Sequence, residues 1–85
     1  MKKQNVLLLE YLINNKKITG MEALRNLGIF SYTKRISELR AMGCLICTHW
    51  ETKKSRFGKK RFAVYELCRV PKKIKKMLDN YKKIS

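Results

Sequence analysis

Residues 18–43, ITGMEALRNLGIFSYTKRISELRAMG, decide the fold of this chain. Thr19 can cap the start of a first short helix, and Glu22 stands three residues later, which completes a capping box. Gly28 is placed to end that helix, because glycine accepts the positive φ of a helix C′ position. The helix carries an apolar stripe at helical spacing, formed by Met21, Ala23, Leu24 and Leu27.

A second short helix follows, after a turn in which Ile29 can plug the core. Ser31 can cap this helix and Gly43 can end it. Its spacing predicts a buried face made of Tyr32, Ile36, Leu39 and Gly43. The opposite face holds Lys34, Ser37, Glu38 and Ala41, with Thr33 and Arg40 on one flank. Two short helices with a glycine-bearing turn form a helix-turn-helix pattern. The polar face either reaches base edges in a major groove or is only the solvated side of a core helix.

The charge of the chain points to a polyanionic partner. The 85 residues have a formal net charge of +15, from 21 Lys and Arg against 6 Asp and Glu. Self-repulsion on this scale opposes compaction, so nucleic acid is the simplest partner. A chain this short has little room for a deep catalytic cleft. It has no signal-peptide pattern and no long apolar span, so we expect a cytoplasmic protein with reduced cysteines.

The flanking segments predict one more helix and a hairpin. Gln4–Asn14 has an apolar stripe at helical spacing, made of Leu8, Tyr11 and Leu12 and widened by Leu7 and Val6. Ile18 can form a one-bridge strand at a sheet edge. Cys44–Lys53 and Arg61–Cys68 alternate with a two-residue period, which is typical of strands. Lys54–Lys60 contains a glycine and little core material, so we expect a turn there. A hairpin directly after the second short helix would be a wing.

The end of the chain predicts a separate basic helix. Pro71 suits a first helical turn. The predicted organisation is a domain over residues 1–68 and a basic amphipathic helix within residues 69–85. The apolar positions of that helix are Ile74, Met77, Leu78, Tyr81 and Ile84. It could pack on the domain or pair with its copy in a homodimer. Its lysines also suit an acidic protein or an anionic membrane surface, but the apolar face lacks the Trp or Phe that favours membranes.

Four motifs in order resemble a family of small winged helix-turn-helix domains common in bacteriophage and prophage genomes. They are Thr19-Gly20-Met21-Glu22-Ala23, Arg35–Arg40, Arg56–Lys60 and Ala63–Leu67. The resemblance spans roughly residues 5–68. It implies a mainly α fold with a small β-hairpin: a three-helix core and a two-stranded wing, here with an extra C-terminal helix. It also implies DNA binding in the cytoplasm of a bacterial host. Lys34 departs from the pattern, since the family often has a small residue there.

The predicted wing tip concentrates positive charge. Six cations occupy nine positions: Lys53, Lys54, Arg56, Lys59, Lys60 and Arg61. Such a cluster repels itself unless a polyanion neutralises it. We expect Arg56 and Lys59 to reach a minor groove or the flanking phosphates while Phe57 braces the loop. The alternative is a solvated loop kept basic for solubility.

The second short helix supplies the other predicted contacts. Thr33, Lys34, Ser37 and Ala41 are expected near base edges. Ser31 and the free N–H groups at the helix start are expected at a phosphate, and Arg40 at the DNA backbone. Arg35 could bind DNA or pair with Glu22 or Glu38. Glu38 could accept from a cytosine or hold Arg35 or Lys34. The predicted DNA-binding set is Ser31, Thr33, Lys34, Ser37, Arg40, Ala41, Lys54, Arg56, Lys59, Lys60 and Arg61.

The cysteines invite a zinc interpretation that strand geometry disfavours. Cys44 and Cys47 form a Cys-x-x-Cys pair, with His49 and Cys68 nearby in the pattern. Residues three apart on a strand point to opposite faces, so we expect buried, inert thiols and no metal. Trp50 is expected in the core or at the wing base, with contact to a sugar of the nucleic acid as the alternative. No phosphate-binding glycine loop or catalytic signature is present, so we predict no cofactor, no catalytic residue and no enzyme.

These features predict sequence-specific binding of double-stranded DNA, by a transcriptional regulator or a recombination accessory factor of a phage or prophage. The rival hypothesis is a protein-interaction module that inhibits host machinery, such as a polymerase or a defence nuclease. A third hypothesis is RNA binding by the basic stretches. DNA affinity that falls steeply with salt and prefers one sequence would favour DNA binding. Tight, nearly salt-insensitive capture of a single host protein would favour the protein-interaction module. The RNA-binding hypothesis predicts that substituting Lys34, Ser37 and Ala41 hardly changes binding.

Overall fold

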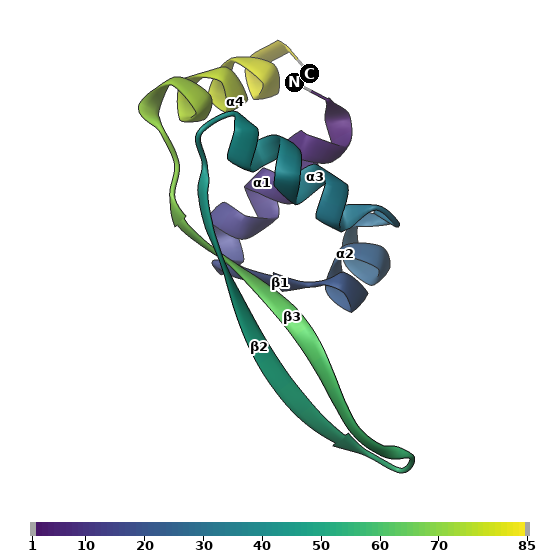
Figure 1. Ribbon diagram of the computed structural model, residues 1–85. Coiled ribbons are helices and arrows are strands. Elements are labelled where there is room, and N and C mark those ends of the chain that lie inside the picture. The colour runs from purple at the N-terminus through teal and green to yellow at the C-terminus, as the bar shows by residue number, and fades with distance from the viewer. Residues whose placement is uncertain (1, 85) are drawn as a thin grey trace.

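The computed structural model describes the backbone of residues 2–84 and the side chains as far as Lys82. Helices cluster at one end of the molecule, and a long hairpin extends away from them (Figure 1). The helices and strands follow one another as α1 (Lys3–Asn15), β1 (Lys17–Thr19), α2 (Gly20–Leu27), α3 (Tyr32–Ala41), β2 (Leu45–Ser55), β3 (Gly58–Arg69) and α4 (Lys72–Ile84). None of the helices described is long and apolar enough to cross a bilayer.

The core forms where α1 meets α2, α3 and the base of the sheet. Leu8, Leu9 and Leu12 of α1 are fully buried. The predicted stripe is thus shifted by one position: Leu9, which it did not include, is buried, whereas Leu7 and Tyr11 are only half-buried. The other fully buried large side chains are Ile18, Ile29, Ile36 and Leu39. Ile29 thus plugs the core from the turn, as predicted.

The predicted apolar stripe of α2 is only partly correct. Ala23 is fully buried and Leu27 is half-buried, but Met21 and Leu24 are 64% and 41% exposed. The predicted buried face of α3 needs one correction as well, because Gly43 is exposed.

Backbone geometry confirms most of the predicted helix ends. The hydroxyl of Thr19 accepts from the Glu22 N–H at 3.2 Å, and the Glu22 carboxylate accepts from the Thr19 N–H at 3.0 Å. Gly28 has a φ of 67° and Gly43 a φ of 106°, both in the region that favours glycine. Ser31 differs from the prediction, since its side chain makes no capping hydrogen bond.

The sheet has the order β1-β3-β2, with both pairs antiparallel. Ile18 is the middle residue of the three-residue strand β1, opposite Tyr65, so the predicted edge bridge is a short strand. The hairpin strands are longer than predicted and leave only Arg56 and Phe57 between them. Pairing continues to Ser55 and Gly58. The predicted turn over residues 54–60 is therefore wrong, because most of those residues belong to strands.

The C-terminal helix joins the core of the chain. Ile74 and Leu78 of α4 are 4% and 3% exposed and belong to the same apolar cluster as the α1 leucines. Lys82 extends the packing with an ion pair to Glu10 of α1 at 3.1 Å. Among the α4 side chains described, Met77 is the large apolar one left exposed. Ile84, the last predicted apolar position, lies outside the side chains described, and Ser85 lies outside the described residues.

Candidate functional site

The exposed surface of α3 is a narrow polar strip. Thr33, Lys34, Ser37 and Ala41 are all exposed, as the helical spacing predicts. The Ser37 hydroxyl donates to the Thr33 carbonyl at 3.1 Å, which orders the side chain along the helix. Ser31 is exposed at the start of α3, and its hydroxyl is not used in a cap. This end of α3 thus presents a hydroxyl and a helix N-terminus to solvent, a combination that suits an anion.

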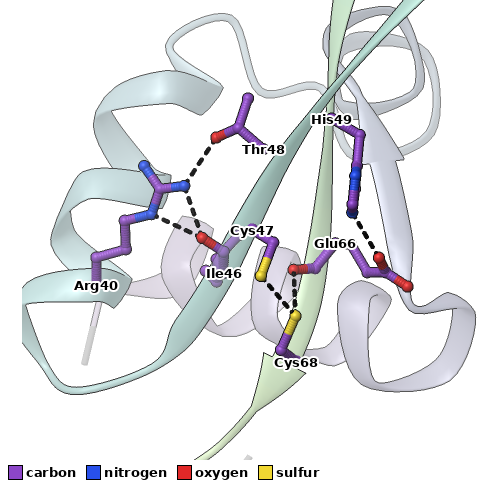
Figure 2. A network of polar contacts seen from close by, with 7 residues as sticks. All are labelled: Arg40, Ile46, Cys47, Thr48, His49, Glu66 and Cys68. Atoms are coloured by element: carbon purple, nitrogen blue, oxygen red, sulfur yellow. Dashed lines mark hydrogen bonds and ion pairs between the residues drawn. The ribbon is translucent and has the colours of Figure 1, made fainter.

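Arg40 does not simply extend from the flank of α3. Its Nε and Nη2 donate to the Ile46 carbonyl at 3.1 and 2.6 Å, and Nη2 also donates to the Thr48 hydroxyl at 2.9 Å (Figure 2). The guanidinium lies 5.5 Å from the centroid of the Tyr65 ring. Three hydrogen bonds and a cation–π contact therefore fasten α3 to both hairpin strands, a role that the sequence did not reveal.

Two tyrosines complete this joint between α3 and the hairpin. The Tyr32 and Tyr65 rings meet edge to face, with centroids 5.5 Å apart and planes at 71°. Burial, with a smaller contribution from Tyr65, raises the pKa of Tyr32 above its ordinary value of 10.0. Gly20 lets the Tyr32 ring approach, because a Cβ there would lie 2.7 Å from Cε1 of the ring. These contacts pack α3 against the hairpin.

A polar cluster holds the other side of α3 against α1. The Glu38 carboxylate accepts from Lys2 Nζ at 3.0 Å, and its other oxygen lies 3.1 Å from Arg35 Nε, as an ion pair without hydrogen-bond alignment. The Lys2 hydrogen bond is the main reason why the pKa of Glu38 falls below 4.5. Glu38 is half-buried, so its predicted outward position is wrong. Of its predicted roles, the structure shows the one of holding Arg35.

The wing cations divide between the two faces of the hairpin. Thr48 and Tyr65 lie directly opposite each other and both contact α3. Pairing is regular from Ile46 to Ser55, so alternate residues share that face. The face in contact with α3 continues through Trp50, Lys54, Lys59 and Arg61, and the other face carries Lys53 and Lys60.

Like charges face each other across the outer part of the hairpin. Lys54 is paired with Lys59, and Lys53 with Lys60. Like charges in such positions destabilise a sheet. In the part of the chain described with side chains, none of these lysines forms an ion pair. The wing therefore carries a charge that the chain itself leaves uncompensated.

Trp50 lies on this wing and not in the core. It is 59% exposed, which overturns the predicted core position. Trp50 lies one register position beyond Val64, where pairing with β1 ends, and this agrees with the predicted alternative at the wing base. The Arg61 guanidinium lies 4.9 Å from the centroid of its ring. Such a contact at an exposed site keeps the cation close to the ribbon surface without neutralising it.

The wing tip is a short, ordered turn. The Ser55 hydroxyl donates to the Gly58 carbonyl at 2.9 Å and accepts from the Phe57 N–H at 3.3 Å. Ser at the first position and Gly at the fourth suit a type I turn, and Gly58 has a φ of 117°. Phe57 is 94% exposed, so the prediction that it braces the loop is wrong. The bracing comes from Ser55.

The cysteines lie at the base of the hairpin. Cys44 is buried, and burial raises the pKa of its thiol. Cys47 is half-buried and Cys68 exposed, with their sulfur atoms 2.8 Å apart (Figure 2), so the prediction of buried thiols is correct for Cys44 alone. His49 Nε2 lies 2.6 Å from a Glu66 carboxylate oxygen. No group of three potential metal ligands is close enough to hold an ion in the part of the chain that the structure describes.

Comparison with known proteins agrees with this architecture. A family model described as a winged helix-turn-helix domain matches residues 3–70. The matched segment runs from α1 to the end of β3, and so contains both the α2–α3 pair and the hairpin. No curated protein and no solved structure matches the chain.

Proposed function

Because this chain belongs to the winged helix-turn-helix family, we propose that it binds double-stranded DNA with a sequence preference. In this proposal α3 enters the major groove and directs Thr33, Lys34, Ser37 and Ala41 to base edges. Ser31 and the first N–H groups of α3 meet a phosphate. Arg40 acts mainly by fixing the wing relative to α3.

One observation carries the proposal: the directly opposed lysine pairs of the wing. Lys54 faces Lys59 and Lys53 faces Lys60, with no acidic partner among the described side chains. A protein that keeps a destabilising arrangement of this kind has a use for the charge, and DNA phosphates would remove the repulsion. Arg56 and Arg61 add to the same surface.

The reach of the wing fits this use. Pairing with β1 ends at Val64, so six residues of β3 continue beyond β1. At about 3.3 Å per residue this part of the ribbon is about 20 Å long. Such a length is sufficient to cross a phosphate backbone from the major groove and meet the adjacent minor groove, which is about 6 Å wide.

We further propose that the protein acts in bacterial cytoplasm as a small phage or prophage regulator of transcription, or as a recombination accessory factor. Its resemblance to phage domains in four ordered motifs supports this setting. A homodimer through α4 would have to use the exposed face of this helix, because Ile74 and Leu78 are buried in the chain's own core.

The test is the salt dependence of binding to duplexes selected from a random library, followed by fluorescence anisotropy. Lys54→Ala/Lys59→Ala should lower the slope of log affinity against log salt by about 1.8, since each phosphate contact contributes about 0.9. Lys17→Ala is the matched control, because Lys17 is an exposed sheet lysine beside Glu66 on the face away from α3. Its slope should stay unchanged.

A second variant tests recognition by α3. Lys34→Ala/Ser37→Ala should relax the selected consensus, because base-edge contacts and not phosphate contacts carry sequence information. An unchanged salt slope in the wing variant would contradict the role of the wing. An unchanged consensus in the α3 variant would indicate shape-driven or single-stranded binding. Tight, salt-insensitive capture of one host protein, without duplex binding, would favour the rival function.

A further inference from the structure

The wing ends in an aromatic ring that the protein does not use for its own stability. Phe57 is 94% exposed, the highest value among the large apolar side chains described. It lies at the far end of a cationic ribbon, about 20 Å beyond the end of β1 by strand geometry. We propose that Phe57 is a wedge, which enters between two stacked base pairs from the minor groove and bends the duplex. This inference rests on the proposed DNA binding and adds a mechanism to it.

The turn presents the ring in a fixed way. Ser55 bonds to both the Gly58 carbonyl and the Phe57 N–H, so the turn is closed by a side chain as well as by backbone pairing. Behind it, pairing is regular from Ser55 and Gly58 back to Ile46 and Leu67. A wedge must resist being pushed aside as base pairs unstack, and a short turn on a continuous ribbon provides that resistance.

The charge around the ring identifies the partner. Arg56 is its neighbour in the turn, and Lys54 and Lys59 form the second cross-strand pair behind it. An apolar ring surrounded by uncompensated cations does not fit an apolar protein pocket unless that pocket has an acidic rim. It does fit DNA, where phosphates flank a groove whose floor consists of stackable bases. Phe is one of the apolar side chains that minor-groove proteins insert at base steps, with bends of about 20–90°.

The proposal predicts that bending and affinity depend on different residues of one turn. Removing the ring should abolish the bend, and should weaken binding about tenfold because one base–aromatic contact is lost. Removing the neighbouring cation should weaken binding and lower the salt slope by about 0.9 while the bend remains. Arg56→Ala is therefore the matched control for Phe57→Ala. Phe57→Leu should restore most of the bend, since leucine also serves as a wedge.

The experiment uses the full chain and a duplex selected from the random library. End-to-end energy transfer reports the bend, and 2-aminopurine placed at successive adenines reports unstacking at single steps. The wild type should bend the duplex and raise the fluorescence at one step, and Phe57→Ala should do neither at saturating protein. Because the ring is exposed, circular dichroism and the melting temperature of Phe57→Ala should match the wild type.

Four outcomes would overturn the wedge. If the wild type binds the duplex without a bend or an unstacked step, or if Phe57→Ala bends it equally, the wedge is wrong and the proposed DNA binding stands. If binding is stronger to single strands and requires Phe57, the ring stacks on unpaired bases instead. If the wild type binds no duplex, both proposals fail. If it binds the duplex but needs Phe57 only to capture an acidic protein, the wedge alone fails.

Discussion

Replacing Arg40 by alanine should lower the free energy of unfolding by about 2 kcal/mol. The guanidinium donates twice to the Ile46 carbonyl and once to Thr48, and lies over Tyr65. Hydrogen bonds from a charged group contribute about 1.5–3 kcal/mol, and we take the lower end because Arg40 is exposed. The cation–π contact at an exposed site adds about 0.5 kcal/mol.

Thermal and urea unfolding followed by circular dichroism measure this loss. For a domain of this size, about 2 kcal/mol corresponds to a fall of about 8–16 °C in melting temperature. Arg40→Lys keeps the charge but not the planar fork, so it should show most of the same loss. Lys34→Ala is the control on the same helix, because Lys34 is exposed; its change should stay within about 0.5 kcal/mol.

The same variants decide between two roles for this side chain. If Arg40→Ala unfolds like the wild type, the joint between α3 and the hairpin does not depend on the guanidinium, and the reasoning above is refuted. A lowered salt slope of DNA binding by about 0.9, with unchanged stability, would instead make Arg40 a phosphate ligand.

Three further predictions concern the rest of the chain. Leu78→Ala should cost about 2–5 kcal/mol in urea unfolding, because Leu78 is 3% exposed; a loss under about 0.5 kcal/mol would show that α4 adds little to the core. The Lys2 hydrogen bond lowers the pKa of Glu38, so this contact stabilises the fold above pH 4.5 and is lost as the pH falls through the lowered pKa. Glu38→Gln should therefore melt below the wild type at neutral pH, with a difference that shrinks in acid; a difference independent of pH would contradict the ion pair. Hydrogen peroxide should join Cys47 to Cys68 by a disulfide bond. The two thiols lose their hydrogens, hydrogen peroxide is reduced to two molecules of water, and the mass of the protein falls by about 2 Da. The reaction should be faster at high pH, because the hydrogen bond with Cys47 raises the pKa of Cys68 above 9.0; Cys68→Ser should show no such loss.

Local signals were sufficient to predict the helices. The structure confirms both predicted ends of α2. Its start is marked by the capping box of Thr19 and Glu22, and its end by Gly28. The apolar spacing of α1 and α3 predicted most of their buried faces for the same reason, since helix periodicity is a local property; Leu9 was missed, and Gly43 is exposed. Ser31 fails this test because an N-cap residue can hold the helix start through its carbonyl, which here accepts from the N–H groups of Lys34 and Arg35.

The extent of the hairpin could not be predicted from composition. Lysines are rare in strands, so the run from Lys53 to Lys60 indicated a loop. In the structure these residues pair because Ser55 and Gly58 close a tight turn. The register set at the buried base of the hairpin therefore continues without a shift to the tip. Trp50 is exposed for a related reason. It lies beyond the part of the hairpin that β1 and the helices cover, and alternation alone does not reveal that limit.

The candidate site was partly predictable. The exposure of Thr33, Lys34, Ser37 and Ala41 follows from helix geometry. The contacts of Arg40 depend on where the Ile46 carbonyl lies. This carbonyl is next to a shift in the β2–β3 register, which falls between Leu45 and Ile46 of β2. No local pattern encodes that position, because it is fixed only when α3 and β2 pack together.

The uninterrupted pairing of the hairpin also limits how this protein can change over time. From the Ile46–Leu67 pair to the Ser55–Gly58 pair, each residue of one strand is paired with one residue of the other, and only two residues form the turn between the strands. A lone inserted or deleted amino acid in either arm would invert every side chain beyond it, sending Lys54 or Lys59 to the reverse surface. Viable length variants should therefore gain or lose residues on both arms together, in steps that keep the cations aligned.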